Sequence, residues 1–303
     1  MIRLAPLVCA ATVLAQAPPP APKPPTFAAR IEAVFVDAFV TEGGVPITGL
    51  AAPDFELKDN GVRQEVELAS VEATPLSTVL VFDTSGSVAG ERLTALKAAG
   101  RAFLDGLREG DEAALLTFSH ALARPVRPTR DLGELRRALD GIRAEGHTAL
   151  MDAIYAGLKA PAGRERAMLV LFTDGEDNLS FLTEDEVFAV ALESHALIHA
   201  VGLTGAGAGT APREPWERAQ EPDHIRGLRR LTESTGGRFW EAASAAHLKD
   251  TFAAILESMK TRYILRYEPT NVARPGLHRL ELRLRKRKGA VHARRAYYVP
   301  GGR

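Results

Sequence analysis

Cysteine is almost absent from the 303-residue sequence, which contains only Cys9. A single cysteine excludes a disulfide-linked scaffold and a zinc site made of several cysteines. A net charge is also absent, because 38 basic residues balance 38 acidic ones. Hydrophobic residues make up 46% and charged residues 25% of the chain, values typical of globular domains, so a disordered, collagen-like or coiled-coil protein is excluded.

Long hydrophobic runs are missing beyond the N-terminus. The apolar residues 4–15 follow Arg3 and end in Ala15-Gln16-Ala17, a small-x-small pattern typical of signal-peptide cleavage sites. We expect residues 1–17 to be an export signal, which places the mature protein in a bacterial periplasm or outside the cell. A membrane anchor is an alternative, but the run is shorter than the roughly 18 residues of a spanning helix. A lipoprotein site at Cys9 is another alternative, disfavoured by the bulky Val8 before it.

Both flanks of the chain have the pattern of β-strands. Residues 18–26 hold six of the nineteen prolines and predict an extended linker. Apolar residues alternate along 27–74, and Asn60-Gly61 predicts a hairpin turn with Phe55, Leu57, Val66 and Leu68 on one face. Residues 262–303 predict strands at 263–267, 280–285 and 291–299. We expect 27–74 and 262–303 to pack together as a small β domain.

The C-terminal segment carries a local excess of positive charge. Residues 262–303 contain twelve Lys or Arg and two Asp or Glu residues. In 280–285 leucines alternate with charged residues, so the charges lie on the outward face of a strand. A solvated strand face explains this charge better than nucleic-acid binding, and no nucleic-acid partner is expected.

The middle of the chain, residues 75–261, alternates short apolar strands with helical stretches. This is the pattern of β-α-β units. Strands are predicted at 78–82, 112–118, 167–172 and 197–203, and their nearly continuous apolar character suits a sheet buried on both faces. Helices are predicted at 91–107, 131–142, 148–159, 183–194, 225–234 and 246–260. The sequence therefore predicts an α/β fold, a doubly wound, mainly parallel sheet with helices on both faces.

Two acidic residues directly follow predicted strands. Asp83 opens Asp83-Thr84-Ser85-Gly86-Ser87, and Asp174 follows the strand at 167–172. Ligands gather at the carboxyl ends of parallel strands, so both carboxylates point into one crevice if the two strands are neighbours. Carboxylate and hydroxyl oxygens favour Mg²⁺, Mn²⁺ or Ca²⁺ over zinc.

These residues resemble a known family. Asp-x-Ser-x-Ser at 83–87, Gly146-His147-Thr148 before a later helix, and Thr173-Asp174-Gly175 after a second strand are similar, in order and spacing, to the metal-ion-dependent adhesion site of von Willebrand factor A domains. The resemblance covers about residues 75–261. More loosely, the flanks resemble those of secreted bacterial proteins that carry this domain.

The resemblance implies a metal site and a binding function. Ser85, Ser87 and Thr148 would offer hydroxyl ligands, and Asp83 and Asp174 would coordinate directly or through water. Mg²⁺ is the expected ion, with Mn²⁺ and Ca²⁺ as alternatives, and it would bridge to an exposed Glu or Asp of a partner protein. His147 departs from the glycine that is common before this threonine.

Two other functions remain open. One is a structural module of an envelope assembly in which the ion stabilises loops, and the other is a metal-dependent hydrolase, although no nucleophile-elbow or P-loop motif is present. His195 and His199 mimic a zinc spacing, but we expect them in different elements and without a shared face. No catalytic residue is predicted.

A long insert follows the predicted strand at 197–203. Residues 204–222 are rich in Gly, Ala and Pro, and loops of this length are often functional. The insert leaves the same edge of the sheet as the metal residues, so Trp216 is expected as a partner contact together with His147. A disordered surface loop with no ligand role is the open alternative for the insert.

Overall fold

The computed structural model describes residues 33–69, 75–122, 126–161, 166–175, 177–203, 221–273 and 275–301. These residues belong to one compact unit, Glu32–Arg303. The expected signal at 1–17, the linker at 18–26 and Trp216 lie outside the described residues. None of the described helices has the length and apolar character of a membrane span.

A six-stranded sheet forms the centre of the molecule. Its strand order is β11-β10-β9-β6-β7-β8, in which β8 alone pairs antiparallel to its neighbour. Every residue of β6 and of β9 is buried, as their nearly unbroken apolar sequences predict. The strands are β6 (Ser77–Asp83), β7 (Glu112–Phe118), β8 (Val126–Thr129), β9 (Ala167–Thr173), β10 (Ala196–Leu203) and β11 (Phe239–Ala242).

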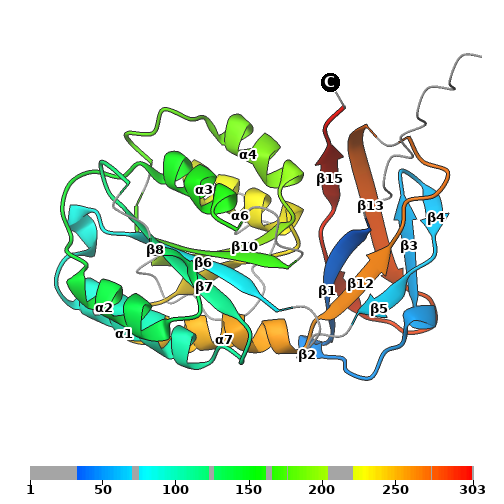
Figure 1. Cartoon of the computed structure of the whole chain (residues 1–303), viewed down its shortest axis with the longest axis horizontal. Coiled ribbons are helices and arrows are strands. Elements are labelled where there is room, and N and C mark those ends of the chain that lie inside the picture. The colour runs from blue at the N-terminus through cyan, green and yellow to red at the C-terminus, as the bar shows by residue number, and fades with distance from the viewer. Residues whose placement is uncertain are drawn as a thin grey trace, which may run out of the picture. The chain divides into compact units, whose positions relative to one another are not determined.

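Helices cover both faces of this sheet (Figure 1). On one face lie α1 (Glu91–Asp105), α2 (Leu132–Gly141) and α7 (Leu248–Lys260), and on the other α3 (Leu150–Lys159), α4 (Glu184–Glu193) and α6 (Asp223–Ser234). Phe82, Phe103 and Phe252 pack edge to face in the first layer. The α/β fold predicted from the sequence is therefore confirmed.

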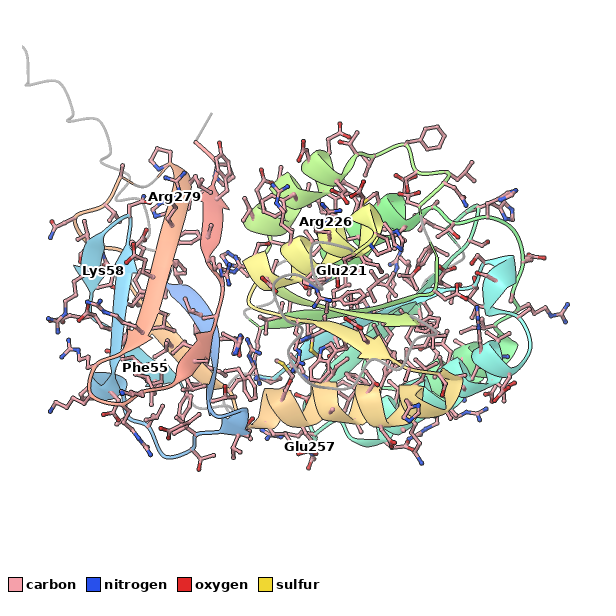
Figure 2. All side chains as sticks on the ribbon, turned by 180° about the vertical axis from the view of Figure 1, so that it is seen from behind. Phe55, Lys58, Glu221, Arg226, Glu257 and Arg279 are labelled. Atoms are coloured by element: carbon pink, nitrogen blue, oxygen red, sulfur yellow. The ribbon has the colours of Figure 1, made fainter. Side chains whose placement is uncertain are left out.

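The two flanks of the chain form two further sheets, with strand orders β14-β1-β12-β5 and β15-β13-β3-β4. In each sheet a strand from the N-terminal flank pairs antiparallel with one from the C-terminal flank, β1 with β12 and β3 with β13. Arg279 stands exposed on β13, and Figure 2 shows it together with Lys58 of β3. The strands are β1 (Val34–Glu42), β2 (Val45–Pro46, beside β1), β3 (Phe55–Asp59), β4 (Val62–Gln64), β5 (Glu67–Ala69), β12 (Tyr263–Tyr267), β13 (Gly276–Leu284), β14 (Ala290–His292) and β15 (Ala296–Val299).

Two predictions about the flanks are wrong in detail. The hairpin ends at Gln64, because β5 leaves it and pairs with β12, which leaves Leu68 38% exposed instead of on the hairpin face. The strand predicted at 291–299 is two strands, because β14 pairs with β1 and β15 with β13. Alternation along a strand predicts which residues share a face but not which strand lies beside them. The short β8 was not predicted.

The order of the central strands decides where the candidate site lies. β6 and β9 are parallel neighbours, with Val81 opposite Leu171 and Phe82 opposite Phe172. Asp83 and Asp174 therefore stand at the same edge of the sheet, as the sequence analysis required. Short one-turn helices at Ala52–Asp54, Gly86–Val88 and Ala245–His247 complete the fold.

Candidate metal centre

Asp83, the last residue of β6, is fully buried at the carboxyl edge of the sheet. Its Oδ1 accepts a hydrogen bond from the Ser85 backbone N–H at 2.8 Å, and its Oδ2 accepts one from the Thr173 hydroxyl at 2.8 Å. Burial raises the pKa of the Asp83 carboxyl above its ordinary value, the hydrogen bonds from Ser85 and Thr173 oppose this rise, and the nearby Asp174 adds to it. A cation at this edge would favour the ionised form.

The two serines connect the first loop to the second acidic residue. The Ser85 and Ser87 hydroxyl oxygens lie 3.0 Å apart, and the Ser87 hydroxyl donates to Asp174 Oδ1 at 2.6 Å. Ser85 is buried and Ser87 is exposed. Two hydroxyls and one carboxylate therefore form a continuous chain in which the exposed Ser87 joins the buried Ser85 to the buried carboxylate of Asp174.

Thr148 lies buried just before α3, on a third loop. This loop is bonded to the first one, because the Gly86 N–H donates to the Gly146 carbonyl at 3.0 Å and the Glu145 N–H donates to the Thr84 carbonyl at 2.8 Å. A β-carbon added at Gly175 would lie 3.9 Å from the Thr148 hydroxyl oxygen. The structure thus brings all five residues proposed as metal ligands to one place.

Gly146 allows the backbone conformation of the loop that carries Thr148. Its φ is +81°, and a β-carbon there would lie 2.1 Å from His120 Nδ1, so no other residue fits without a shift. The tight position before Thr148 is Gly146, and His147 itself is exposed. His147 is therefore placed where a partner can reach it.

The donor set fits a hard divalent cation. It consists of hydroxyl and carboxylate oxygens, which suit Mg²⁺, Mn²⁺ or Ca²⁺. Within the described ranges there is no group of three or more His, Cys, Asp and Glu side chains that could hold an ion. His199 is fully buried, its Nδ1 accepts from Arg238 N–H and Trp240 Nε1–H, and burial lowers its pKa to about 3.

Three residues at the site were given no role by the sequence analysis, although one of them, Thr173, belongs to the Thr173-Asp174-Gly175 motif. Arg92, near the start of α1, places Nη1 2.6 Å from Asp174 Oδ2. Thr173 bonds Asp83, and Asn178 exchanges two hydrogen bonds with the Thr148 backbone, each 3.1 Å long. Thr173 could have been recognised as a hydroxyl at the end of a strand, but nothing local marks Arg92 or Asn178.

The loop between β9 and α4 is tied to the N-terminus of α3. The Asp177 carboxylate accepts hydrogen bonds from the N–H groups of Met151, Leu179 and Ser180. Asp152 in turn accepts the N–H groups of Phe181 and Leu182.

This well-bonded loop nevertheless displays two large apolar side chains. Phe181 is 95% exposed and Leu179 is 45% exposed. The hydrogen bonds of Asp177 and Asp152 fix the loop in a conformation that exposes both side chains.

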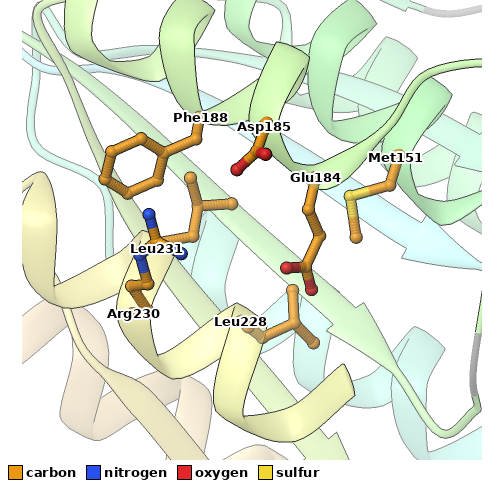
Figure 3. A pocket seen from close by; sticks show the side chains of 8 residues that line it. Met151, Glu184, Asp185, Phe188, Leu228, Arg230 and Leu231 are labelled. Atoms are coloured by element: carbon orange, nitrogen blue, oxygen red, sulfur yellow. The ribbon is translucent and has the colours of Figure 1, made fainter. Parts of the chain in front are cut away.

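Two hollows lie near these elements. An open groove of about 860 Å³ adjoins the loop and is lined by residues that include Leu150, Met151, Asn178, Leu179 and Pro222. A second hollow, between α4 and α6, has only about 10 Å³, room for at most one water molecule (Figure 3). Asn178, one of the residues that line the groove, accepts a hydrogen bond from the Thr148 N–H of the candidate site.

Residues 78–176 match the profile of the family described as von Willebrand factor type A domain. This segment of the chain, about a third of its length, is therefore similar to a von Willebrand factor type A domain. The matched segment holds all five candidate ligands of the A domain, from Asp83 to Asp174.

Curated relatives share parts of this chain. An uncharacterized protein of Synechocystis sp. is 32% identical over 108 residues, 34% of this chain and 26% of its own length. A UPF0353 protein of Mycolicibacterium paratuberculosis is 25% identical over 203 residues, 60% of this chain and 59% of its own length. This chain therefore spans between about a quarter and three fifths of these relatives.

Solved structures support the fold. The von Willebrand domain of the type V pili tip protein Mfa5 from Porphyromonas gingivalis matches 62% of this chain and 95% of its own, with a TM-score of 0.50 and 14% identity. A von Willebrand factor type A protein from Catenulispora acidiphila matches 90% of this chain and 74% of its own, with a TM-score of 0.50 and 13% identity. The A-domain fold with additional strands is thus found in other proteins.

Proposed function

We propose that this chain is an exported, divalent-metal-dependent protein-binding module. The observation that carries the proposal is the convergence of Ser85, Ser87 and Thr148 with two carboxylates at one edge of the sheet. Bound Mg²⁺, or Mn²⁺ or Ca²⁺ in its place, would supply an open coordination position for a Glu or Asp carboxylate of a partner protein. No catalytic role is proposed.

The described hydrogen bonds divide the five residues into two roles. Both oxygens of Asp83 and both oxygens of Asp174 already accept hydrogen bonds. These carboxylates would therefore contribute negative charge, and the lone pairs that remain on their oxygens would reach the ion directly or through water. The three hydroxyls are the donors that we expect to contact the ion directly.

The surface around the site supports a protein ligand. Phe181 and Leu179 expose apolar surface on the loop that is bonded to Thr148 through Asn178. Exposed apolar patches rimmed by polar groups are typical of protein–protein interaction sites. The Porphyromonas gingivalis neighbour is by name a pilus tip protein, in keeping with a role at the cell surface. His147 and Trp216 remain proposed partner contacts.

A structural role for the ion is the second candidate. The loops that carry Ser85 and Thr148 are already joined by backbone hydrogen bonds of 2.8 and 3.0 Å, so they have little need of an ion to hold them. A hydrolase has less support, because among the described residues no histidine hydrogen-bonds to the Ser85 or Ser87 hydroxyl.

Thermal unfolding of the full chain tests metal binding. We compare chelator with Mg²⁺, Mn²⁺ and Ca²⁺, using Asp83→Ala and, as a matched control, Asp105→Ala, which removes an exposed aspartate paired with Arg136. An ion at 100 times its Kd should add about 2.7 kcal/mol of stability. A rise in the wild type and in Asp105→Ala that is absent from Asp83→Ala supports the site. No rise with any ion in the wild type contradicts it.

The bridging role is tested on binding itself. A partner that is retained in Mg²⁺ and released by chelator, while circular dichroism shows an unchanged fold, supports the bridge. Binding that survives chelator with the fold intact favours the structural role.

A further inference from the structure

Arg92 is a cation built into the candidate metal centre. It is the second residue of α1, and its Nη1 lies 2.6 Å from Asp174 Oδ2 and 3.2 Å from the Ser87 carbonyl oxygen. The Asp174 side chain is 1% exposed, whereas that of Arg92 is 50% exposed. The guanidinium therefore lies at the surface side of a buried carboxylate.

The position of Arg92 matters because of the charges around it. Asp83 and Asp174 are two carboxylates at the same edge of the sheet, and their negative charges repel each other. Arg92 offsets part of this repulsion. A divalent cation drawn to the same hydroxyls and carboxylates would meet the guanidinium as a like charge beside Ser87 and Asp174.

We propose that Arg92 is an internal counter-ion that competes with the divalent cation for Asp174 and so sets the metal affinity of the site. This inference rests on the metal binding proposed above. Because coupling between two sites is reciprocal, any group that draws Arg92 away from Asp174, such as a carboxylate of a bound partner, strengthens metal binding by the same factor as the metal strengthens the binding of that group.

The direct test measures Mn²⁺ affinity by titration calorimetry on the full chain. Arg92→Gln removes the charge and keeps a polar side chain, Arg92→Lys keeps the charge, and Arg101→Gln is the matched control. Arg101 lies on the same helix and pairs with the exposed Asp140. We expect Arg92→Gln to lower the Kd for Mn²⁺ roughly fivefold at low salt, and Arg92→Lys and Arg101→Gln to stay within about twofold of the wild type. The difference should shrink at higher ionic strength, since salt screens exposed charges.

Each result decides between the alternatives. If the wild type binds Mn²⁺ but Arg92→Gln binds it equally or more weakly, the competition is overturned and the metal-binding proposal stands. If Arg92→Gln and Arg92→Lys both bind more tightly by the same factor, charge is not the cause and the inference fails. If no variant binds the ion, both proposals fail. If only Arg92→Gln binds, the inference is supported and metal loading in the wild type must depend on a partner.

A second readout follows Arg92 itself. The Arg92 side-chain Nε–H signal in NMR spectra should shift on addition of Mg²⁺ in the wild type, as the guanidinium leaves Asp174. The Arg101 signal, reporting a pair away from the motif, should not move. An unchanged Arg92 signal at saturating Mg²⁺ would contradict the exchange.

Discussion

At the carboxyl edge of the central sheet, Asp174 is bonded to an exposed serine and to a half-exposed arginine. At the amino edge, by contrast, Arg166, Arg262 and Arg294 are all buried. Arg166 contacts Asp37 of β1 at 3.3 Å, Arg262 donates to the Gly236 carbonyl, and Arg294 donates to the Ser194 carbonyl. These contacts join the flanking strands to the starts of β9, β10 and β11.

Charged side chains therefore have different roles at the two edges of the sheet. Buried guanidinium groups at the amino edge bond the flanking sheets to the central sheet. Burial lowers the pKa of Arg262 and of Arg294 to about 10. Polar groups at the carboxyl edge are held by hydrogen bonds, and two of them, Ser87 and Arg92, are exposed to solvent. Stability should thus depend mainly on the first edge, and binding on the second.

Replacing Asp37 should give the largest effect. Asp37→Asn removes the carboxylate that pairs with buried Arg166, and leaving a buried charge without its partner costs on the order of 3 kcal/mol. Urea unfolding of the full chain measures this loss. The matched control, Asp140→Asn, breaks the exposed pair with Arg101 and should cost less than about 1 kcal/mol. Equal losses of unfolding free energy in the two variants would contradict the idea that stability depends mainly on the amino edge.

The free energy of unfolding should depend on pH because of His199. Burial lowers its pKa from 6.5 to about 3, so its contribution to stability is fully present above pH 6.5 and is lost as the pH falls toward 3. Between pH 7 and pH 5 the loss should be about 2 kcal/mol. The Gln side chain of His199→Gln does not titrate in this range. Measured by urea unfolding at the two pH values, the stability of this variant should therefore fall by about 2 kcal/mol less than that of the wild type. The same pH dependence in both proteins would show that other groups are responsible.

Gly146→Ala should damage the carboxyl edge by a smaller amount. The substitution forces a β-carbon onto a residue with φ +81° and against His120, which we expect to cost about 1–2 kcal/mol. It should also reduce the stabilisation by Mg²⁺, since Gly146 accepts the hydrogen bond from Gly86. Thermal unfolding with and without Mg²⁺ checks both effects.

A second glycine provides the control for Gly146. Gly141, at the end of α2, has nothing within 4 Å of an added β-carbon and no positive φ. Gly141→Ala should be neutral or slightly stabilising, and its response to Mg²⁺ should equal that of the wild type. If Gly146→Ala behaves in the same way, the loop tolerates more than its geometry indicates.

The smallest effect on stability is expected at Phe181. Because its side chain is 95% exposed, Phe181→Ser should change the free energy of unfolding by no more than about 0.5 kcal/mol. Partner binding, measured with any protein captured in Mg²⁺, should fall several-fold. Tyr155→Ser, on the exposed side of α3, is a control that should leave binding unchanged. Unchanged binding in Phe181→Ser would remove the loop from the proposed interface.

Local patterns predicted the central domain well. The continuous apolar character of β6 and β9 predicted their burial on both faces of the sheet. Strand pairing in the flanks was harder, as the departure of β5 from its expected hairpin shows. Short strands with one polar face carry too little local information to choose between the available sheet edges.

The five ligand residues were proposed from the resemblance of three short motifs to the metal-ion-dependent adhesion site, and such motifs can be read along the chain without its tertiary structure. Their convergence required β6 and β9 to be neighbours, which depends on contacts between residues about ninety positions apart, such as Thr173 with Asp83. Arg92 and Asn178 joined the site only through packing, since neither belongs to a local pattern. The partner of a side chain on an amphipathic helix or a loop depends on which element packs against it. The packing of the whole core decides which elements are neighbours.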